Sequence, residues 1–117
     1  MLIVYAIVAI PLALGLLASA QLKLTKNPRI VEGIGGRLGV PLKWFPALAA
    51  LEIAGALGLI AGLWIGPLGA AAGVGIVCYF IGAASTHVRA HDNKGVATPV
   101  VLGLAGAAAL SLRFLSL

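Results

Sequence analysis

Residues 46–66 read PALAALEIAGALGLIAGLWIG and contain one ionisable side chain, Glu52, in an otherwise apolar run. A run of this length can cross the ~30 Å hydrocarbon core of a bilayer as a helix that rises ~1.5 Å per residue. An ionised carboxylate within such a span costs at least about 2.5–3.5 kcal/mol and usually faces the interior of a bundle, where it finds a partner. The stretch therefore predicts a transmembrane helix whose carboxylate faces other helices.

The composition extends this prediction to the whole chain. Of its 117 residues, 62% are hydrophobic and 9% are charged, whereas soluble domains contain about 25% charged residues. Only helices and closed barrels satisfy every backbone group in lipid, and the apolar runs lack the alternation of barrel strands. We therefore expect an all-α fold, a single membrane-embedded four-helix domain over residues 1–117. Its spans are expected at residues 2–22, 46–65, 67–87 and 96–115.

The link between the first two spans predicts a short interfacial segment. Asn27 can cap a helix there and Pro28 can begin it. The following GIGGRLG, residues 33–39, lacks the GxGxxG spacing and the preceding strand of a nucleotide-binding loop. We expect it to turn the chain along the membrane surface.

The basic residues predict an orientation. They cluster in the first and third links, at Lys23, Lys26, Arg29, Arg37, Lys43, Arg89 and Lys94. The positive-inside rule puts both links in the cytoplasm and both termini outside, although Arg113 near the C-terminus mildly opposes this. We expect an integral protein of a bacterial cytoplasmic membrane. The net charge of +5 suits anionic headgroups, and no basic recognition element points to nucleic acid.

Small residues recur at intervals of four in the second and third spans, at Gly58, Gly62, Gly66, Gly69 and Gly73. Such spacing lets helix backbones approach closely in lipid. We favour packing within the chain over a homodimer face, and the sequence leaves both open.

The polar residues near the cytoplasmic end predict a cluster. Glu52 lies roughly 9 Å into its helix, and His87 ends the third span on the same side. Arg89 and Asp92 follow in STHVRAHDNKG, residues 85–95. We expect His87 or Arg89 to be the partner of Glu52 in a small pocket. The alternative for Glu52 is a purely structural role, in which its bond to His87 or Arg89 holds the helices together, and the alternative for Arg89 is a topology anchor, which we favour over a substrate contact.

The candidate residues divide into two overlapping sets. Lys23 and Arg37 either hold lipid phosphate or complete the pocket. The catalytic candidates are Glu52, His87 and Asp92, and the ligand-binding candidates are Lys23, Arg37, Glu52, His87 and Arg89.

Several chemistries are disfavoured by the residue count. Cys78 is the only cysteine, so the chain has no CxxC pair, and its position within the third span predicts a buried packing residue. His87 and His91 lie too close together in the sequence to ligate a haem from facing helices. A metal site from His87, His91 and Asp92 is a weak possibility, and we expect none.

The ordered set of motifs resembles the DoxX-like family of small four-span membrane proteins. The matching pieces are ASAQLKL, NPRIVEGIGGRLGVP, LEIAGALGLIAG, GAASTHVRAHDNKG and a proline at the opening of the last span. The resemblance implies a set of family positions, namely Lys23, Pro28, Glu32, Gly33, Gly39, Pro41, Glu52, Gly55, His87, Arg89, Asp92 and Pro99.

The resemblance implies a membrane subunit associated with thiosulfate:quinone oxidation or with thiol and oxidant defence, while another branch resembles a chaperone for receptor assembly. Three functions follow as expectations. The first is a redox subunit whose pocket holds a quinone-like cofactor, with other membrane subunits or a second copy as partners. The second is an acid–base enzyme acting on a lipophilic substrate, and the third is an assembly protein.

Overall fold

Every regular element in the described part of the chain is helical. The computed structural model describes residues 2–92 and 95–116, and for residues 33, 37 and 42 it describes the backbone only. The elements are α1 (Leu2–Leu24), α2 (Pro28–Ile30), η1 (Val31–Arg37), η2 (Leu42–Trp44), α3 (Phe45–Ala61), α4 (Gly66–Arg89) and α5 (Ala97–Leu115).

Three helices, α1, α4 and α5, are long and apolar enough to cross a membrane, as judged by length and composition. The fourth apolar helix, α3, has 17 residues, which is at the short end of the range of about 17–25 that spans a bilayer. It ends four residues before the predicted limit at Ile65, because residues 62–65 form successive tight turns that reverse the chain. The predicted all-α membrane bundle is thus confirmed.

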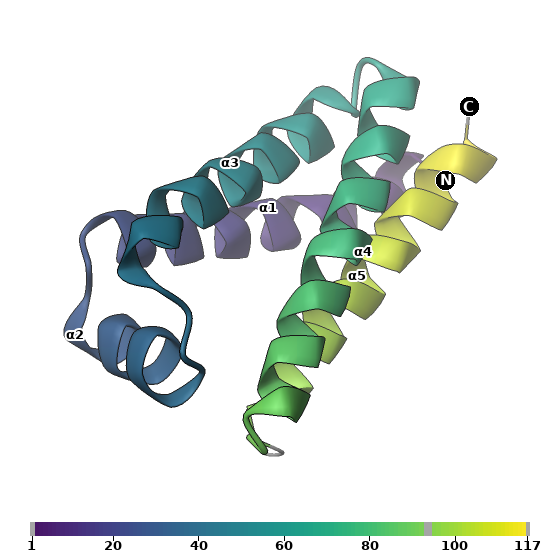
Figure 1. The fold of residues 1–117 in the computed structure, drawn as a ribbon. Helices are drawn as coiled ribbons and strands as arrows, with labels where there is room; N and C mark the ends of the chain where they lie inside the picture. The colour runs from purple at the N-terminus through teal and green to yellow at the C-terminus, as the bar shows by residue number, and fades with distance from the viewer. Residues whose placement is uncertain (1, 93–94, 117) are drawn as a thin grey trace.

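The four long helices form two pairs (Figure 1). α1 packs along α3, and α4 packs along α5. The pairs meet where α3 turns into α4 and diverge toward the end that holds α2, so that α3 and α4 form a V (Figure 1). Both chain termini lie at the closed end of this V.

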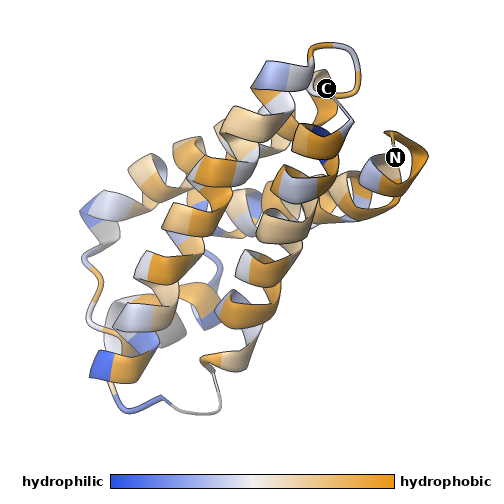
Figure 2. Cartoon of the chain, turned by 90° about the vertical axis from the view of Figure 1, so that its right-hand side faces the viewer, coloured by the Kyte–Doolittle hydropathy of each residue, from blue (hydrophilic) through white to orange (hydrophobic). Residues whose placement is uncertain are grey.

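Colouring the ribbon by residue hydropathy distinguishes the end of the molecule that holds α2 from the long helices (Figure 2). The long helices are mostly hydrophobic along their lengths, and hydrophilic residues gather near α2 and the link between α4 and α5 (Figure 2). Large apolar side chains such as Ile3, Ile7 and Leu104 are exposed on the helices, where lipid covers them in an integral membrane protein.

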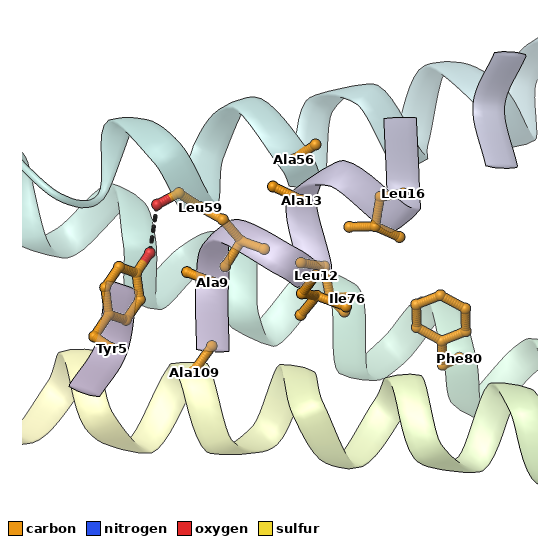
Figure 3. Close-up of a cluster of buried hydrophobic side chains, with 10 residues drawn as sticks. All are labelled: Tyr5, Ala9, Leu12, Ala13, Leu16, Ala56, Leu59, Ile76, Phe80 and Ala109. Atoms are coloured by element: carbon orange, nitrogen blue, oxygen red, sulfur yellow. Dashed lines mark hydrogen bonds between the residues drawn. The ribbon is translucent and has the colours of Figure 1, made fainter. Parts of the chain in front are cut away.

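The core follows the spacing of three and four residues that places side chains on one helix face. On α1 this face includes Tyr5, Leu12 and Leu16. Figure 3 shows Tyr5 at one end of the core and Phe80 of α4 at the other. The inner face of α3 carries buried Ala49, Glu52, Ala56 and Leu59, which confirms that Glu52 points into the bundle.

The glycines act within the chain. A methyl group on Gly58 would lie 2.7 Å from the Ala72 side chain, and one on Gly62 would collide with the Gly69 backbone. Gly73 faces Leu110 of α5, and a methyl group on Gly73 would lie only 2.7 Å from the Leu110 Cβ. The predicted packing of these faces inside the molecule is therefore confirmed for α3, α4 and α5.

The segment after α1 forms the predicted short helix. Pro28 begins α2, and the Asn27 side chain accepts a hydrogen bond of 3.1 Å from the Arg29 amide. The chain then continues as the wide helical turn η1 through most of the glycine-rich stretch. It changes direction near Gly39, the last residue of the stretch that was expected to turn the chain, and the φ of 73° at Gly39 suits a residue without a Cβ.

Candidate functional site

A buried ion pair joins α1 to α3. The Lys23 ammonium lies 2.7 Å from Oε1 of Glu52, and it also donates a hydrogen bond of 2.8 Å to the Ser19 hydroxyl. Lys23 is 6% exposed and Glu52 is 3% exposed. The pair is electrically neutral as a unit, which allows a carboxylate to lie inside a membrane bundle.

The partner of Glu52 differs from the predicted one. His87 or Arg89 was expected, and this was wrong because the neighbour of Glu52 at the open end of the V is the last turn of α1. Lys23 continues the inner face of α1 seven residues after Leu16. That spacing was a usable signal for an inward-pointing lysine, although basic residues at span ends are usually read as topology anchors.

A third polar group, Tyr79 of α4, approaches the same carboxylate. Tyr79 and Glu52 are electrostatic neighbours, and both line the cavity described below. Tyr79 was not among the predicted residues. The sequence offered one weak clue to Tyr79. This residue lies one helical turn after Gly75, and both line the cavity on the side of α4 that faces α3.

Glu52 and Tyr79 line one end of a cavity between α3 and α4. Its volume is about 600 Å³, within the range of roughly 300–1,000 Å³ typical of small-molecule sites. The remaining wall is mostly apolar, and half of its residues are small, namely Ala54, Gly55, Gly58, Ala71, Ala72 and Gly75. Along α4 the lining extends from Leu68 to Phe80, a length of about 18 Å at ~1.5 Å per residue.

The cavity exists because the helix pairs diverge. Close contact between Gly62 and Gly69 holds α3 against α4 at the closed end, and the two helices diverge toward the end that holds α2 (Figure 1). Small side chains on both facing surfaces leave this gap unfilled. The result is a largely apolar site with a polar end, placed within the membrane-spanning part of the bundle.

His87 and Asp92 form a separate pair at the end of α4. The His87 Nδ1 atom lies 3.0 Å from Oδ2 of Asp92, and the Gly95 amide donates to Oδ1 of the same carboxylate. The helix ends with His91 in a left-handed conformation at φ 59°, and the Asp92 amide donates to the His87 carbonyl. This C-terminal turn brings Asp92 back over His87.

The other predicted residues lie around this end. Arg89 is exposed and borders a shallow depression with Leu38 and Thr86. His91 is exposed. The Arg37 side chain and Lys94 lie outside the described residues.

A second polar cluster, not predicted, lies at the closed end of the V. Arg113 of α5 is 8% exposed, and its Nε donates a hydrogen bond of 2.6 Å to the Gly62 carbonyl at the end of α3. The guanidinium also lies 5.9 Å from the centre of the Tyr5 ring, and the Tyr5 hydroxyl donates to the Leu59 carbonyl (Figure 3). Arg113 and Tyr5 therefore each satisfy one backbone carbonyl near the end of α3, those of Gly62 and Leu59 respectively.

Cys78 was expected to be buried, and this was wrong. It is exposed and lines the cavity between α3 and α4. The inner face of α4 is formed by Gly69, Gly73, Ile76 and Phe80, and a residue two positions from Ile76 points away from that face.

The described side chains include no group of three or more His, Cys, Asp or Glu residues that could hold a metal ion.

These features define a small helical integral membrane protein with an intramembrane cavity and a buried neutral ion pair. A model of the DoxX-like family matches residues 7–110 of the chain. The protein therefore belongs to the DoxX-like family. Comparison with curated proteins and with solved structures gives no match.

Proposed function

We propose that this protein is a small membrane subunit of a redox system and binds a quinone-like lipophilic molecule in the cavity between α3 and α4. The observation that carries the proposal is the cavity itself. It has about 600 Å³ of space and is mostly apolar, and Glu52 and Tyr79 lie at one end. A lipophilic molecule can place its polar head there and its body along the small residues.

The redox assignment rests on the family resemblance, since DoxX-like proteins resemble membrane subunits associated with thiosulfate:quinone oxidation, in which the sulfur compound is oxidised and the quinone is reduced. Because Cys78 is the only cysteine, electrons from a sulfur compound would have to come through another subunit. The proposal therefore includes a partner chain or a second copy.

The proposed setting is a bacterial cytoplasmic membrane with both termini outside. The basic residues of the two links at the open end support this orientation, as does the position of both termini at the opposite end (Figure 1). The whole chain would act as one domain, with the head of the bound molecule toward the cytoplasm.

Two observations favour this function over the alternatives. An acid–base enzyme that pairs His87 with Glu52 would need these groups together, whereas Glu52 bonds to Lys23. The other pair that such an enzyme could use, His87 with Asp92, is formed, but neither residue lines the cavity. An assembly protein would offer its glycine faces to a partner, whereas Gly58, Gly62 and Gly73 pack within the molecule.

The test fills the cavity without disturbing the packing. Gly75 lines the cavity and has open space where a side chain would be added. Gly75→Leu should therefore occupy the site, and Gly82→Leu is the matched control, because Gly82 lies on the same helix in open space. Detergent-purified wild type and both variants are analysed by native mass spectrometry with added decylubiquinone.

Wild type and Gly82→Leu should retain decylubiquinone, and Gly75→Leu should bind it at least about tenfold more weakly, since a leucine would overlap the bound molecule. Equal retention by both variants would place the molecule elsewhere. A wild type that binds neither an endogenous lipophile nor decylubiquinone would refute the proposed function.

A further inference from the structure

We propose that the shallow depression between η1 and the end of α4 binds the headgroup of an anionic phospholipid, and that the Arg89 guanidinium holds the lipid phosphate. This site is separate from the cavity between α3 and α4, since the two share no lining residue. Lipid binding at the depression does not depend on the proposed function.

The depression is built by two segments that are far apart in the sequence. Its volume is about 290 Å³, and it lies between the turn at residues 36–39 and the last turn of α4. Leu38 contributes an apolar surface, and α4 contributes Thr86, Arg89 and Ala90. Because α4 ends at Arg89, and the end of a membrane-spanning helix lies at the level of the lipid headgroups, the site meets a charged head beside hydrocarbon chains.

The charge of Arg89 is available to a ligand. Arg89 is exposed, and within the described residues no hydrogen bond or ion pair involves its guanidinium. Arg113, in the last turn of α5, differs because its guanidinium donates to the Gly62 carbonyl and to Ser116. A guanidinium presents a planar fork of donors that fits the oxygens of a phosphate. Arg89 therefore retains the donors that a lipid phosphate needs.

The surroundings favour a headgroup with a net negative charge. Exposed Lys26, Arg29 and Lys43 lie toward the same end of the molecule, where hydrophilic residues gather (Figure 2). Each basic group near a membrane surface strengthens the attraction for anionic lipid by about fivefold. None of the residues that line the depression is aromatic, so none can cover the choline ammonium of phosphatidylcholine.

The acidic residues near this end lie outside the depression. Glu52 is paired with Lys23, and Asp92 lies against His87. Glu32 lines a neighbouring hollow, which adjoins this one at Gly36 and Gly39 but does not include Arg89. A phosphate in the depression therefore meets Arg89 and no lining carboxylate.

The test measures lipid binding to the full-length protein in detergent by native mass spectrometry. The probes are dioleoylphosphatidylglycerol and dioleoylphosphatidylcholine, which have the same acyl chains and differ in the headgroup. Arg89→Gln removes the proposed phosphate ligand. Arg29→Gln is the matched control, because Arg29 is an exposed arginine toward the same end that does not line the depression.

Wild type should bind its first phosphatidylglycerol at least about fivefold more tightly than phosphatidylcholine. Arg89→Gln should lose this preference and keep its affinity for phosphatidylcholine, whereas Arg29→Gln should keep the preference. Far-ultraviolet circular dichroism should be unchanged in both variants, because both arginines are exposed. Millimolar inorganic phosphate should not displace phosphatidylglycerol, since it lacks the acyl chains that contact the apolar surface.

Equal affinity of wild type for the two lipids would overturn the inference. Equal losses in Arg89→Gln and Arg29→Gln would show that the charge of the whole surface, and not the depression, attracts the lipid. Displacement of phosphatidylglycerol by inorganic phosphate would identify the site as one for a free anion, which would overturn the assignment to a lipid.

Discussion

Removing one member of the ion pair between Lys23 and Glu52 should destabilise the protein strongly. At an effective dielectric constant of about 20, unit charges at the observed 2.7 Å attract each other by about 6 kcal/mol. Much of this attraction offsets the hydration free energy that the two charged groups lose when they are buried. Lys23→Met leaves a buried carboxylate without a counter-charge, so we expect a loss of about 3–5 kcal/mol in the free energy of unfolding.

The double variant Lys23→Met, Glu52→Met should recover most of this loss. Two apolar side chains of similar length replace both charges, and such replacements are often neutral or stabilising by about 1–4 kcal/mol. The coupling between the two sites in a double-mutant cycle should then be at least about 3 kcal/mol.

The measurement is unfolding by sodium dodecyl sulfate added to dodecyl maltoside micelles, followed by far-ultraviolet circular dichroism, with the variants compared at the same sodium dodecyl sulfate fraction. A loss below about 1 kcal/mol for Lys23→Met would mean that water reaches the pair. A double variant as unstable as the sum of the single variants would show that the two side chains act independently. Either result would refute the reasoning.

Three further predictions concern packing and helix ends. Gly62→Ala should cost about 1–3 kcal/mol in the same titration, because its methyl group would meet the Gly69 backbone. Gly82→Ala, in open space, should be neutral or stabilise α4 by up to ~1 kcal/mol, and equal losses would contradict the packing. Arg113→Met should cost about 1.5–3 kcal/mol in thermal unfolding, because the Gly62 carbonyl loses a charged donor; an unchanged midpoint would refute this. His87→Ala should leave decylubiquinone binding unchanged in native mass spectrometry, and a loss of binding would place His87 in the site.

The helices were the predictable part of this fold. Apolar runs bounded by Pro and Gly gave limits within two residues for α1, α4 and α5, because lipid demands such runs. The end of α3 was missed. The Gly62 carbonyl accepts a hydrogen bond from Arg113, and Gly62 packs against Gly69. The hydrophobicity of neighbouring residues does not predict such tertiary contacts.

The site was predicted in part. Glu52 had to face inward, since a lone carboxylate in lipid has few alternatives. Its partner Lys23 lies 29 residues away in the sequence, and the contact depends on how α1 packs beside α3. His87 was expected to lie at a depth in the membrane similar to that of Glu52. Depth along a span, however, does not determine the direction in which a side chain points. The periodic inner faces of α1 and α5 would have identified Lys23 and Arg113.

The ion pair also bears on the order of biosynthesis. Lys23 lies in the last turn of α1, so its ammonium can extend to the headgroups while α3 is still being synthesised. Glu52 is the eighth residue of α3, about 10 Å from the start of that helix, and its short side chain has no such reach. α1 can therefore insert into the bilayer alone. α3 inserts favourably only once α1 is in place, because Lys23 of α1 then supplies the counter-charge for Glu52.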